Sequence, residues 1–174
     1  MTNEVLSAIF SRRSTKKYDG QSISPEELDA ILDAGLWAAN GKAAQAPLSV
    51  AVTDKATRDE LSKMNAAIMG VDTDPFYGAP CVVIVFADST IFTAVEDGSL
   101  VIGNMLLAAE SLGVGACWIH RAKQMFETED GKALMKKWGV AEKYIGVGCC
   151  VLGYATEDGK KVAAPRREGR IIKV

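Results

Sequence analysis

A short basic segment is the part of this chain best equipped to bind an anion. Residues 11–18 read Ser-Arg-Arg-Ser-Thr-Lys-Lys-Tyr, with four cations, three small hydroxyl side chains and no acid. Arg12 and Arg13 carry forked N–H donors, and Ser14 carries a short O–H donor. Lys16 adds a point charge, so the set suits a doubly charged phosphate monoester. The chain as a whole has a net charge of −2, so this positive charge is local. The alternative is a basic turn that is solvated and binds no ligand.

A loop of small residues at 38–47 is a second candidate for ligand binding. It contains Asn40, Gly41 and Gln45, between a predicted helix and a predicted strand. Small residues allow the backbone to approach a flat ligand closely, and the two amide side chains can both donate and accept hydrogen bonds. The alternative is an ordinary helix-to-strand connection.

Two more candidates are a small apolar strand at 113–119 and a basic pair near the C-terminus. The strand can present backbone N–H groups to the ring of a ligand. The alternative interpretation is an ordinary core strand. Its candidate residues are Cys117, Trp118 and Ile119. The basic pair, Arg166 and Arg167, can complete an anion site that begins at Arg12, and its alternative is a solvated tail.

Length and composition predict one globular domain spanning residues 1–174. Hydrophobic residues make up 48% of the chain and charged residues 24%, which is ordinary for a protein with a buried core. A pI near 5.5 argues against non-specific nucleic-acid binding. The N-terminus has neither the positive region nor the apolar core of a signal peptide, and no apolar stretch has membrane-spanning length. We therefore expect a cytoplasmic protein without a nucleic-acid or membrane partner.

The four cysteines are predicted to be buried and reduced. All lie in apolar runs, none forms a C-x-x-C pair, and the chain has one histidine, which argues against a zinc site. Cys149 and Cys150 are adjacent in a predicted strand, so their side chains should point to opposite faces of the sheet.

Hydrophobic periodicity predicts helices and strands in mixed order, which indicates an α+β or α/β layered fold. Ser24, Pro25 and Glu27 form the signature of a capped helix start. The other expected helices cover 5–10, 55–65 (exposed), 94–112 (buried) and 130–138. The expected strands cover 48–52, 81–87, 114–119 and 145–152, with a strand-like end at 170–174 that has no obvious partner in its own chain.

The order of these motifs resembles the FMN-dependent nitroreductase family. The pattern runs from an apolar helix and S-R-R-S-x-K-x-Y through A-x-x-G-x-x-x-Q-x-P to G-x-G-x-C-W-I, G-Y and a basic tail. It covers residues 5–174. The resemblance implies an α+β, three-layer α/β/α fold, with a mixed, mostly antiparallel sheet flanked by helices. It also implies an intertwined homodimer, with the apolar helix 100–109 at or beside the interface and the tail reaching onto the partner.

The resemblance further implies an FMN-dependent oxidoreductase. NAD(P)H would reduce the flavin, and a nitroaromatic, quinone or related acceptor would then take the electrons in a ping-pong cycle. The flavin carries the redox chemistry, so no protein side chain is predicted to be catalytic and no metal is required. Two alternatives stay open: an FMN enzyme of this fold with another reaction, such as dehalogenation or ene reduction, and a flavin-binding redox protein with little turnover. Neither the nicotinamide preference nor the acceptor follows from the sequence.

By the same resemblance, Arg12, Arg13 and Ser14 would hold the FMN phosphate and ribityl chain, and Arg166 and Arg167 would close on the phosphate. A nearby cation at the pyrimidine edge of the isoalloxazine stabilises the anion that reduction creates. Lys16 would reach towards that edge. The residues that would run past the ring are Cys117, Trp118 and Ile119.

The remaining assignments concern the neighbouring subunit and two isolated polar residues. Asn40, Gly41 and Gln45 would contact the flavin of the partner, although the amide role of Gln45 stays open because the flanking residues depart from the family pattern. Asn104 is polar within an apolar helix, so it lies either near the flavin pocket or in a structural hydrogen bond. His120 is expected at the surface or in a structural position rather than at the mouth of the pocket. The stretch 53–80 is short, which predicts a small lid.

Overall fold

The structure is a computed structural model that describes residues 2–174. Its helices are α1 (Glu4–Ser11), α2 (Pro25–Leu36), α3 (Lys55–Met69), α4 (Ala94–Ser111), α5 (Ala122–Glu127) and α6 (Glu129–Lys137), with a short 3-10 helix, η1, at Gly41–Ala43. Its strands are β1 (Pro47–Val52), β2 (Cys81–Asp88), β3 (Gly115–Ile119) and β4 (Tyr144–Gly153). None of the helices between residues 2 and 174 has the length and apolar character needed to cross a bilayer.

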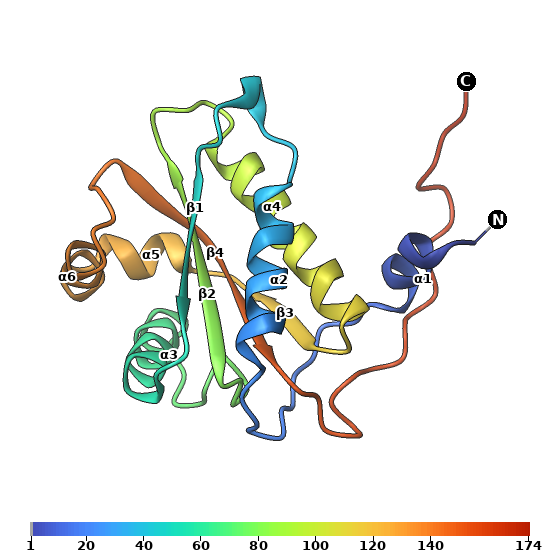
Figure 1. The fold of residues 1–174 in the computed structure, drawn as a ribbon, viewed down its shortest axis with the longest axis horizontal. Helices are drawn as coiled ribbons and strands as arrows, with labels where there is room; N and C mark the ends of the chain where they lie inside the picture. Colours follow the sequence, from blue (N-terminus) through green and yellow to red (C-terminus); the bar gives the residue numbers. More distant parts are fainter. Residues whose placement is uncertain (1) are drawn as a thin grey trace.

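The four strands form one sheet in the order β1-β2-β4-β3, and every neighbouring pair is antiparallel (Figure 1). All residues of β2 are buried, because the strand is central and covered on both faces, as its continuous apolar run predicts. In the part of the chain that the structure describes, the one parallel contact is an isolated bridge between Ser14 and Ala116, outside the named strands. Among residues 2–174 the four-stranded sheet is therefore antiparallel throughout, which confirms the expected antiparallel character but shows no mixed pairing between its strands.

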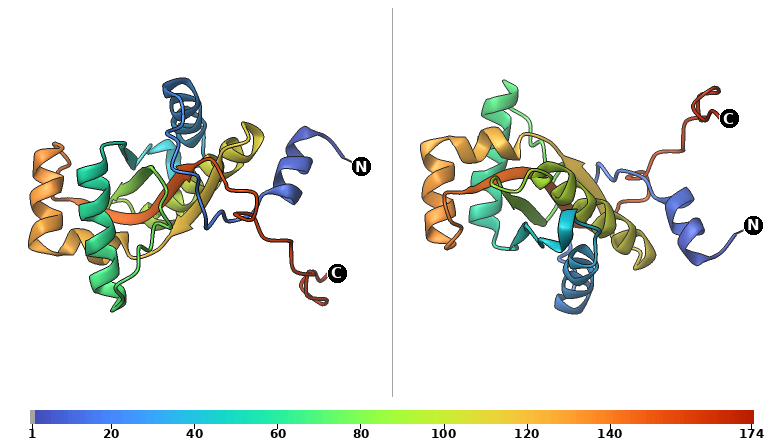
Figure 2. Two further views of the ribbon diagram at one scale, coloured as in Figure 1. Left: turned by 90° about the horizontal axis from the view of Figure 1, so that it is seen from below. Right: turned by 90° about the horizontal axis from the view of Figure 1, so that it is seen from above.

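Helices cover both faces of the sheet, so the predicted three layers are confirmed. Helices α2 and α4 pack on one face, and α3, α5 and α6 pack on the other (Figure 2). Cys149 belongs to the core under α3, α5 and α6, whereas Cys150 belongs to the core under α2 and α4. All four cysteines are free and buried, in agreement with the sequence prediction.

The predicted start of α2 is also confirmed. Glu27 donates its backbone N–H to Ser24 Oγ at 3.1 Å, and the Glu27 carboxylate accepts from the Ser24 N–H at 2.9 Å. Pro25 occupies the first helical position. Tyr154 Oη donates to the same carboxylate at 2.6 Å, which ties the start of α2 to the residue that follows β4.

One predicted helix was wrong in its extent and exposure, and one observed helix was not predicted. Helix α3 continues to Met69, and it is not exposed all round, because Arg58, Ser62 and Asn65 are buried together with Leu61. This i, i+4, i+7 spacing places the three polar residues on one face, toward the protein. Helix α5 was not predicted, because it is short and begins without a side-chain cap.

The two ends of the chain bury little within residues 2–174. Helix α1 contains no buried residue, so its predicted apolar face, with Ile9 and Phe10, is without cover in the single chain. Residues 161–174 are exposed and form no strand, and the tail leaves the body on the same side as α1 (Figures 1 and 2). The absence of a partner for 170–174 within its own chain, noted from the sequence, holds for the described residues.

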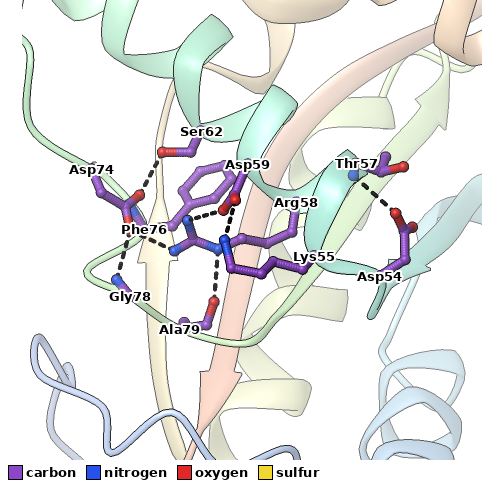
Figure 3. Close-up of polar contacts among 10 residues, drawn as sticks. All are labelled: Asp54, Lys55, Thr57, Arg58, Asp59, Ser62, Asp74, Phe76, Gly78 and Ala79. Carbon is purple, nitrogen blue, oxygen red and sulfur yellow. Dashed lines mark hydrogen bonds and ion pairs between the residues drawn. The ribbon is translucent and has the colours of Figure 1, made fainter.

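A charged network attaches the loop before β2 to helix α3 (Figure 3). Asp74 pairs with Arg58 Nη2 at 2.6 Å and accepts a hydrogen bond from Ser62 Oγ. It also accepts the backbone N–H groups of Phe76 at 2.9 Å and Gly78 at 2.7 Å. The loop that Asp74 organises, residues 72–79, is called the Asp74 loop below.

The protonation of Asp74 links this network to pH. Burial by itself would raise the pKa of the Asp74 carboxyl, but the hydrogen bonds from Arg58, Ser62 and the loop backbone outweigh burial and hold that pKa below its ordinary value of 3.8. A carboxyl whose pKa is lowered by folding contributes stability above its unfolded pKa. That contribution is lost as the pH falls through the folded pKa.

Asp74→Asn is expected to lower the free energy of unfolding near neutral pH by about 1–3 kcal/mol, because charge-assisted hydrogen bonds are lost and Arg58 keeps no carboxylate on the loop. The difference between the variant and wild type in the free energy of unfolding, measured by urea unfolding, should become smaller below about pH 4. The control is Asp72→Asn, an exposed carboxylate in the same loop, which should change stability by less than about 0.5 kcal/mol. An equal loss in both variants, or a difference that does not change with pH, would contradict this account.

Candidate functional site

The basic segment lies along the outer edge of β3. Ser14 forms a bridge with Ala116, and the Thr15 N–H donates to the Ala116 carbonyl at 3.0 Å. On the other side, the Lys16 N–H donates to the Gly159 carbonyl at 3.2 Å. Backbone hydrogen bonds therefore hold the segment between β3 and the chain that follows β4, so the first and third sequence motifs come together.

Three cations of this segment lack a counter-charge. Arg12, Arg13 and Lys16, called the cation group below, form no ion pair with any residue of 2–174. By contrast, the adjacent Lys17 pairs with Asp158. The two arginines are half-buried and Lys16 is exposed, so the group is accessible to an anion from solvent. An unneutralised set of this kind favours phosphate binding.

The electrostatics of Cys117 show that the segment reaches the side chains of β3. Burial raises the pKa of the Cys117 thiol. Ser14, Lys16 and Arg12 act in the opposite direction, because a hydroxyl donor and two cations nearby favour the thiolate. The net direction is upward, so the thiol is held protonated and is not an activated nucleophile.

The other two predicted β3 residues point to opposite faces. Ile119 shares the α3, α5 and α6 side with Cys117, whereas Trp118 packs on the α2 and α4 side. Trp118 fits there because Gly148 has no side chain: a Cβ on Gly148 would lie 2.9 Å from the indole. The part of β3 that faces the basic segment is therefore its backbone edge.

The small-residue loop has a fixed conformation of its own. Asn40 Oδ1 accepts the Gln45 N–H at 2.9 Å, and the Gly41 N–H donates to Asp97 Oδ1 at 2.9 Å. Gln45 has a φ of 47°, a left-handed conformation that non-glycine residues rarely adopt. Asn40 and Gln45 line a cavity of about 390 Å³ beside Trp37.

The single chain does not bring this loop to the cation group. The η1 turn lies at one end of the molecule, beyond the end of α2, whereas the chain that follows α1 passes β3 well away from it (Figure 1). A second cavity, of about 1060 Å³, lies among α5, α6 and the start of β4 and contains none of the predicted site residues. Of these two cavities, the one beside Trp37 is therefore the one lined by predicted site residues.

The remaining predicted residues fall into three places. Asn104 Nδ2 donates to the Ala34 carbonyl at 3.0 Å, which is the structural hydrogen bond between α4 and α2 that the sequence left open. His120 is exposed, as expected. Arg166 and Arg167 lie on the exposed tail, and Arg166 Nη2 donates locally, to the Ala164 carbonyl at 2.7 Å.

Sequence reasoning missed one contact of the cation group and the two hydrogen bonds of a buried amide on α3. The Lys16 ammonium lies 5.4 Å from the centroid of the Tyr77 ring, although the two residues are far apart in sequence. Asn65, fully buried on α3, donates to the His120 carbonyl at 2.8 Å and accepts from Arg121 Nε at 3.0 Å. The available signal was the polar i, i+4, i+7 spacing on α3, a helix that the sequence predicts to be exposed.

Comparison with known proteins places this architecture in one family. The Nitroreductase family matches residues 9–75 and 67–154. A curated protein of Archaeoglobus fulgidus, named provisionally as an NADH dehydrogenase/NAD(P)H nitroreductase, is 30% identical over 163 residues, which cover 89% of this chain and 87% of that protein. An NADPH-flavin oxidoreductase of Vibrio harveyi is 30% identical over 129 residues, covering 67% of this chain and 53% of that longer protein.

A solved structure agrees with the sequence comparisons. The crystal structure of a nitroreductase from Bacteroides fragilis, with bound FMN, superposes with a TM-score of 0.91 at 32% identity, covering 99% of this chain and 100% of that chain. The agreement extends over the whole α+β, three-layer architecture described above. The chain therefore belongs to the nitroreductase family.

Proposed function

We propose that this protein is an FMN-dependent oxidoreductase that takes hydride from NAD(P)H and passes electrons to a nitroaromatic, quinone or related acceptor. The observation that carries the proposal is the cation group, held without counter-charges at the edge of β3. Family membership supports it, and so does the FMN bound to the Bacteroides fragilis relative. The proposal treats residues 1–174 as one FMN-binding domain.

The residues present fit this cofactor. A phosphate dianion needs cations that are not already neutralised, and Arg12, Arg13 and Ser14 supply two guanidinium groups and a hydroxyl at one place. Arg166 and Arg167, also free of ion pairs within residues 2–174, would add to the phosphate site from the tail. Lys16 would serve the pyrimidine edge.

FMN, when bound, supplies the hydride chemistry, and the chain supplies binding and electrostatics. The Lys16 ammonium would stabilise the negative charge that develops at the pyrimidine edge during reduction, which makes reduction easier. The backbone of β3 at Cys117, Trp118 and Ile119, beyond the bridge between Ser14 and Ala116, would run past the ring and limit access of water from that side. No side chain needs to act as a nucleophile, in keeping with the raised pKa of Cys117.

A spectroscopic test separates the proposed function from its alternatives. The FMN-loaded protein is expected to lose its visible absorbance on anaerobic mixing with NADH or NADPH, because hydride passes to the flavin. Absorbance should return when a nitroarene or quinone is added. Stopped-flow absorbance measures both phases, and free FMN at the same concentration is the control. A spectrum that neither nucleotide changes would contradict a reductase and favour a flavin-binding protein.

The phosphate assignment predicts a selective loss of affinity. Arg12→Gln should weaken FMN binding by about 10- to 100-fold, because a charge-assisted hydrogen bond to the phosphate is lost. Riboflavin, which lacks the phosphate, should bind wild type and variant alike. Lys17→Gln is the matched control, because Lys17 already pairs with Asp158. Equal weakening of FMN and riboflavin in titrations of flavin fluorescence would contradict the assignment.

We also infer that two copies of the chain pair. Large apolar side chains are exposed in the single chain, among them Trp37 at 82% and Phe92 at 89%. The tail adds Ile171 at 81% and Ile172 at 85%. Apolar surface of this kind is typical of interfaces between subunits. Pairing would also allow the loop at 40–45, which lies beside Trp37, to approach the cation group of the partner.

Replacing Ile171 and Ile172 together with serine should raise the dimer dissociation constant at least about tenfold, because burying each isoleucine is worth about 1.5–3 kcal/mol. Val162→Ser, at an exposed apolar position earlier in the same tail, is the control and should have little effect. Sedimentation velocity over a dilution series measures the constant. A stable, FMN-loaded monomer of the wild type would refute the pairing.

A further inference from the structure

Tyr77 is the one aromatic residue of the Asp74 loop that faces the cation group. The Lys16 ammonium lies 5.4 Å from its ring centroid, within the range of a cation–π contact. Lys16 has no carboxylate partner within residues 2–174, so the uncharged but electron-rich face of this ring is the electrostatic partner that the structure shows for it. A lysine without such a contact samples many rotamers. The ring therefore restricts where the ammonium can be.

The conformation of Tyr77 is imposed by its neighbours. Its φ is 58°, in the left-handed region that non-glycine residues rarely occupy. Such a conformation persists where the surroundings hold it. Here the backbone N–H groups on either side, of Phe76 and Gly78, both donate to the carboxylate of Asp74.

Helix α3 in turn fixes the position of Asp74. Arg58 pairs with Asp74 Oδ2 at 2.6 Å, and its Nε donates to the Ala79 carbonyl at 2.8 Å (Figure 3). The Arg58 guanidinium also lies 5.5 Å from the centroid of the Phe76 ring, and that ring is fully buried. The loop is therefore anchored before and after Tyr77. Tyr77 itself is 37% exposed and free to contact Lys16.

We propose that Tyr77 is a positioning residue for Lys16, and that the Arg58–Asp74 pair on α3 sets the redox potential of bound FMN by holding Tyr77 in place. The proposal rests on the proposed function, in which Lys16 serves the pyrimidine edge of the flavin. A fixed ammonium favours the reduced, negatively charged flavin over the neutral oxidised form. A mobile ammonium spends part of its time in solvent and favours the reduced form less.

The first test compares Tyr77→Leu with Tyr77→Phe in the FMN-loaded protein. Neither replacement is β-branched, so both suit the backbone of Tyr77 about as well as tyrosine does. Leucine removes the ring, so reduced FMN should bind about two- to fivefold more weakly relative to oxidised FMN. That ratio lowers the two-electron midpoint potential by about 10–20 mV. Phenylalanine keeps the ring face and should retain the wild-type potential.

The second test asks whether the Arg58–Asp74 pair acts through Tyr77. Asp74→Asn should lower the midpoint potential in the same direction as Tyr77→Leu, while Asp72→Asn should leave it unchanged. The double variant Tyr77→Leu/Asp74→Asn should show the shift of Tyr77→Leu alone, because both changes remove one and the same constraint on Lys16. Equilibration with a redox dye measures the potential, and fluorescence titration measures the affinity for oxidised FMN separately.

The outcomes separate this inference from the proposed function. Equal shifts for the leucine and phenylalanine variants, no shift for leucine, or additive shifts in the double variant would each overturn the inference. So would an unchanged potential in Lys16→Met. A wild-type protein that binds no FMN would instead overturn the proposed function, and the inference with it.

Discussion

The structure depends on a group of like charges that the backbone holds together without counter-charges. Two like charges about 4 Å apart near a protein surface repel each other by several kcal/mol at most, and solvent screening reduces this further. Hydrogen bonds from Thr15 to Ala116 and from Lys16 to Gly159 hold the basic segment at the sheet edge in spite of that repulsion. The nearby acids cannot relieve it, because Asp158 is engaged with Lys17. An anion bound here converts an unfavourable arrangement into a favourable one.

Helix α3 shows how a buried polar face can serve a neighbouring site. Burying a guanidinium, a hydroxyl and an amide is costly unless each forms hydrogen bonds. On α3 the partners of Arg58 and Ser62 lie in the Asp74 loop, and the partners of Asn65 lie in the turn after β3. Because burial is costly without these partners, two loops take fixed positions: the Asp74 loop, which contacts Lys16 through Tyr77, and the turn after β3. An apolar face on this helix would pack against the sheet without specifying either loop.

The sequence predicted those parts of the fold that depend on local patterns. The continuous apolar run predicted the central strand β2, and the capping signature of Ser24 and Glu27 predicted the start of α2. The resemblance assigned the basic segment and β3 to one site, and in the structure these two segments do adjoin. What the sequence did not predict depends on partners distant in the chain: the polar face of α3, and the contact between Lys16 and Tyr77. Helix α5 was missed for a local reason, since a short helix that begins after a left-handed Arg121 gives no capping signal.

The loop at 40–45 indicates that one chain contains only part of the proposed flavin site. A Cβ on Gly41 would lie 2.3 Å from Thr93 Oγ1, and Gln45 has a left-handed backbone, so the loop is held in a demanding conformation far from the cations of its own chain. Strain of this kind is usually retained for a function. In the proposed dimer that function is to contact the flavin held by the partner's cations. FMN would then bind the pair of chains more tightly than the single chain, so by linkage the cofactor would stabilise the dimer, and the dimer would retain the cofactor, by the same free energy.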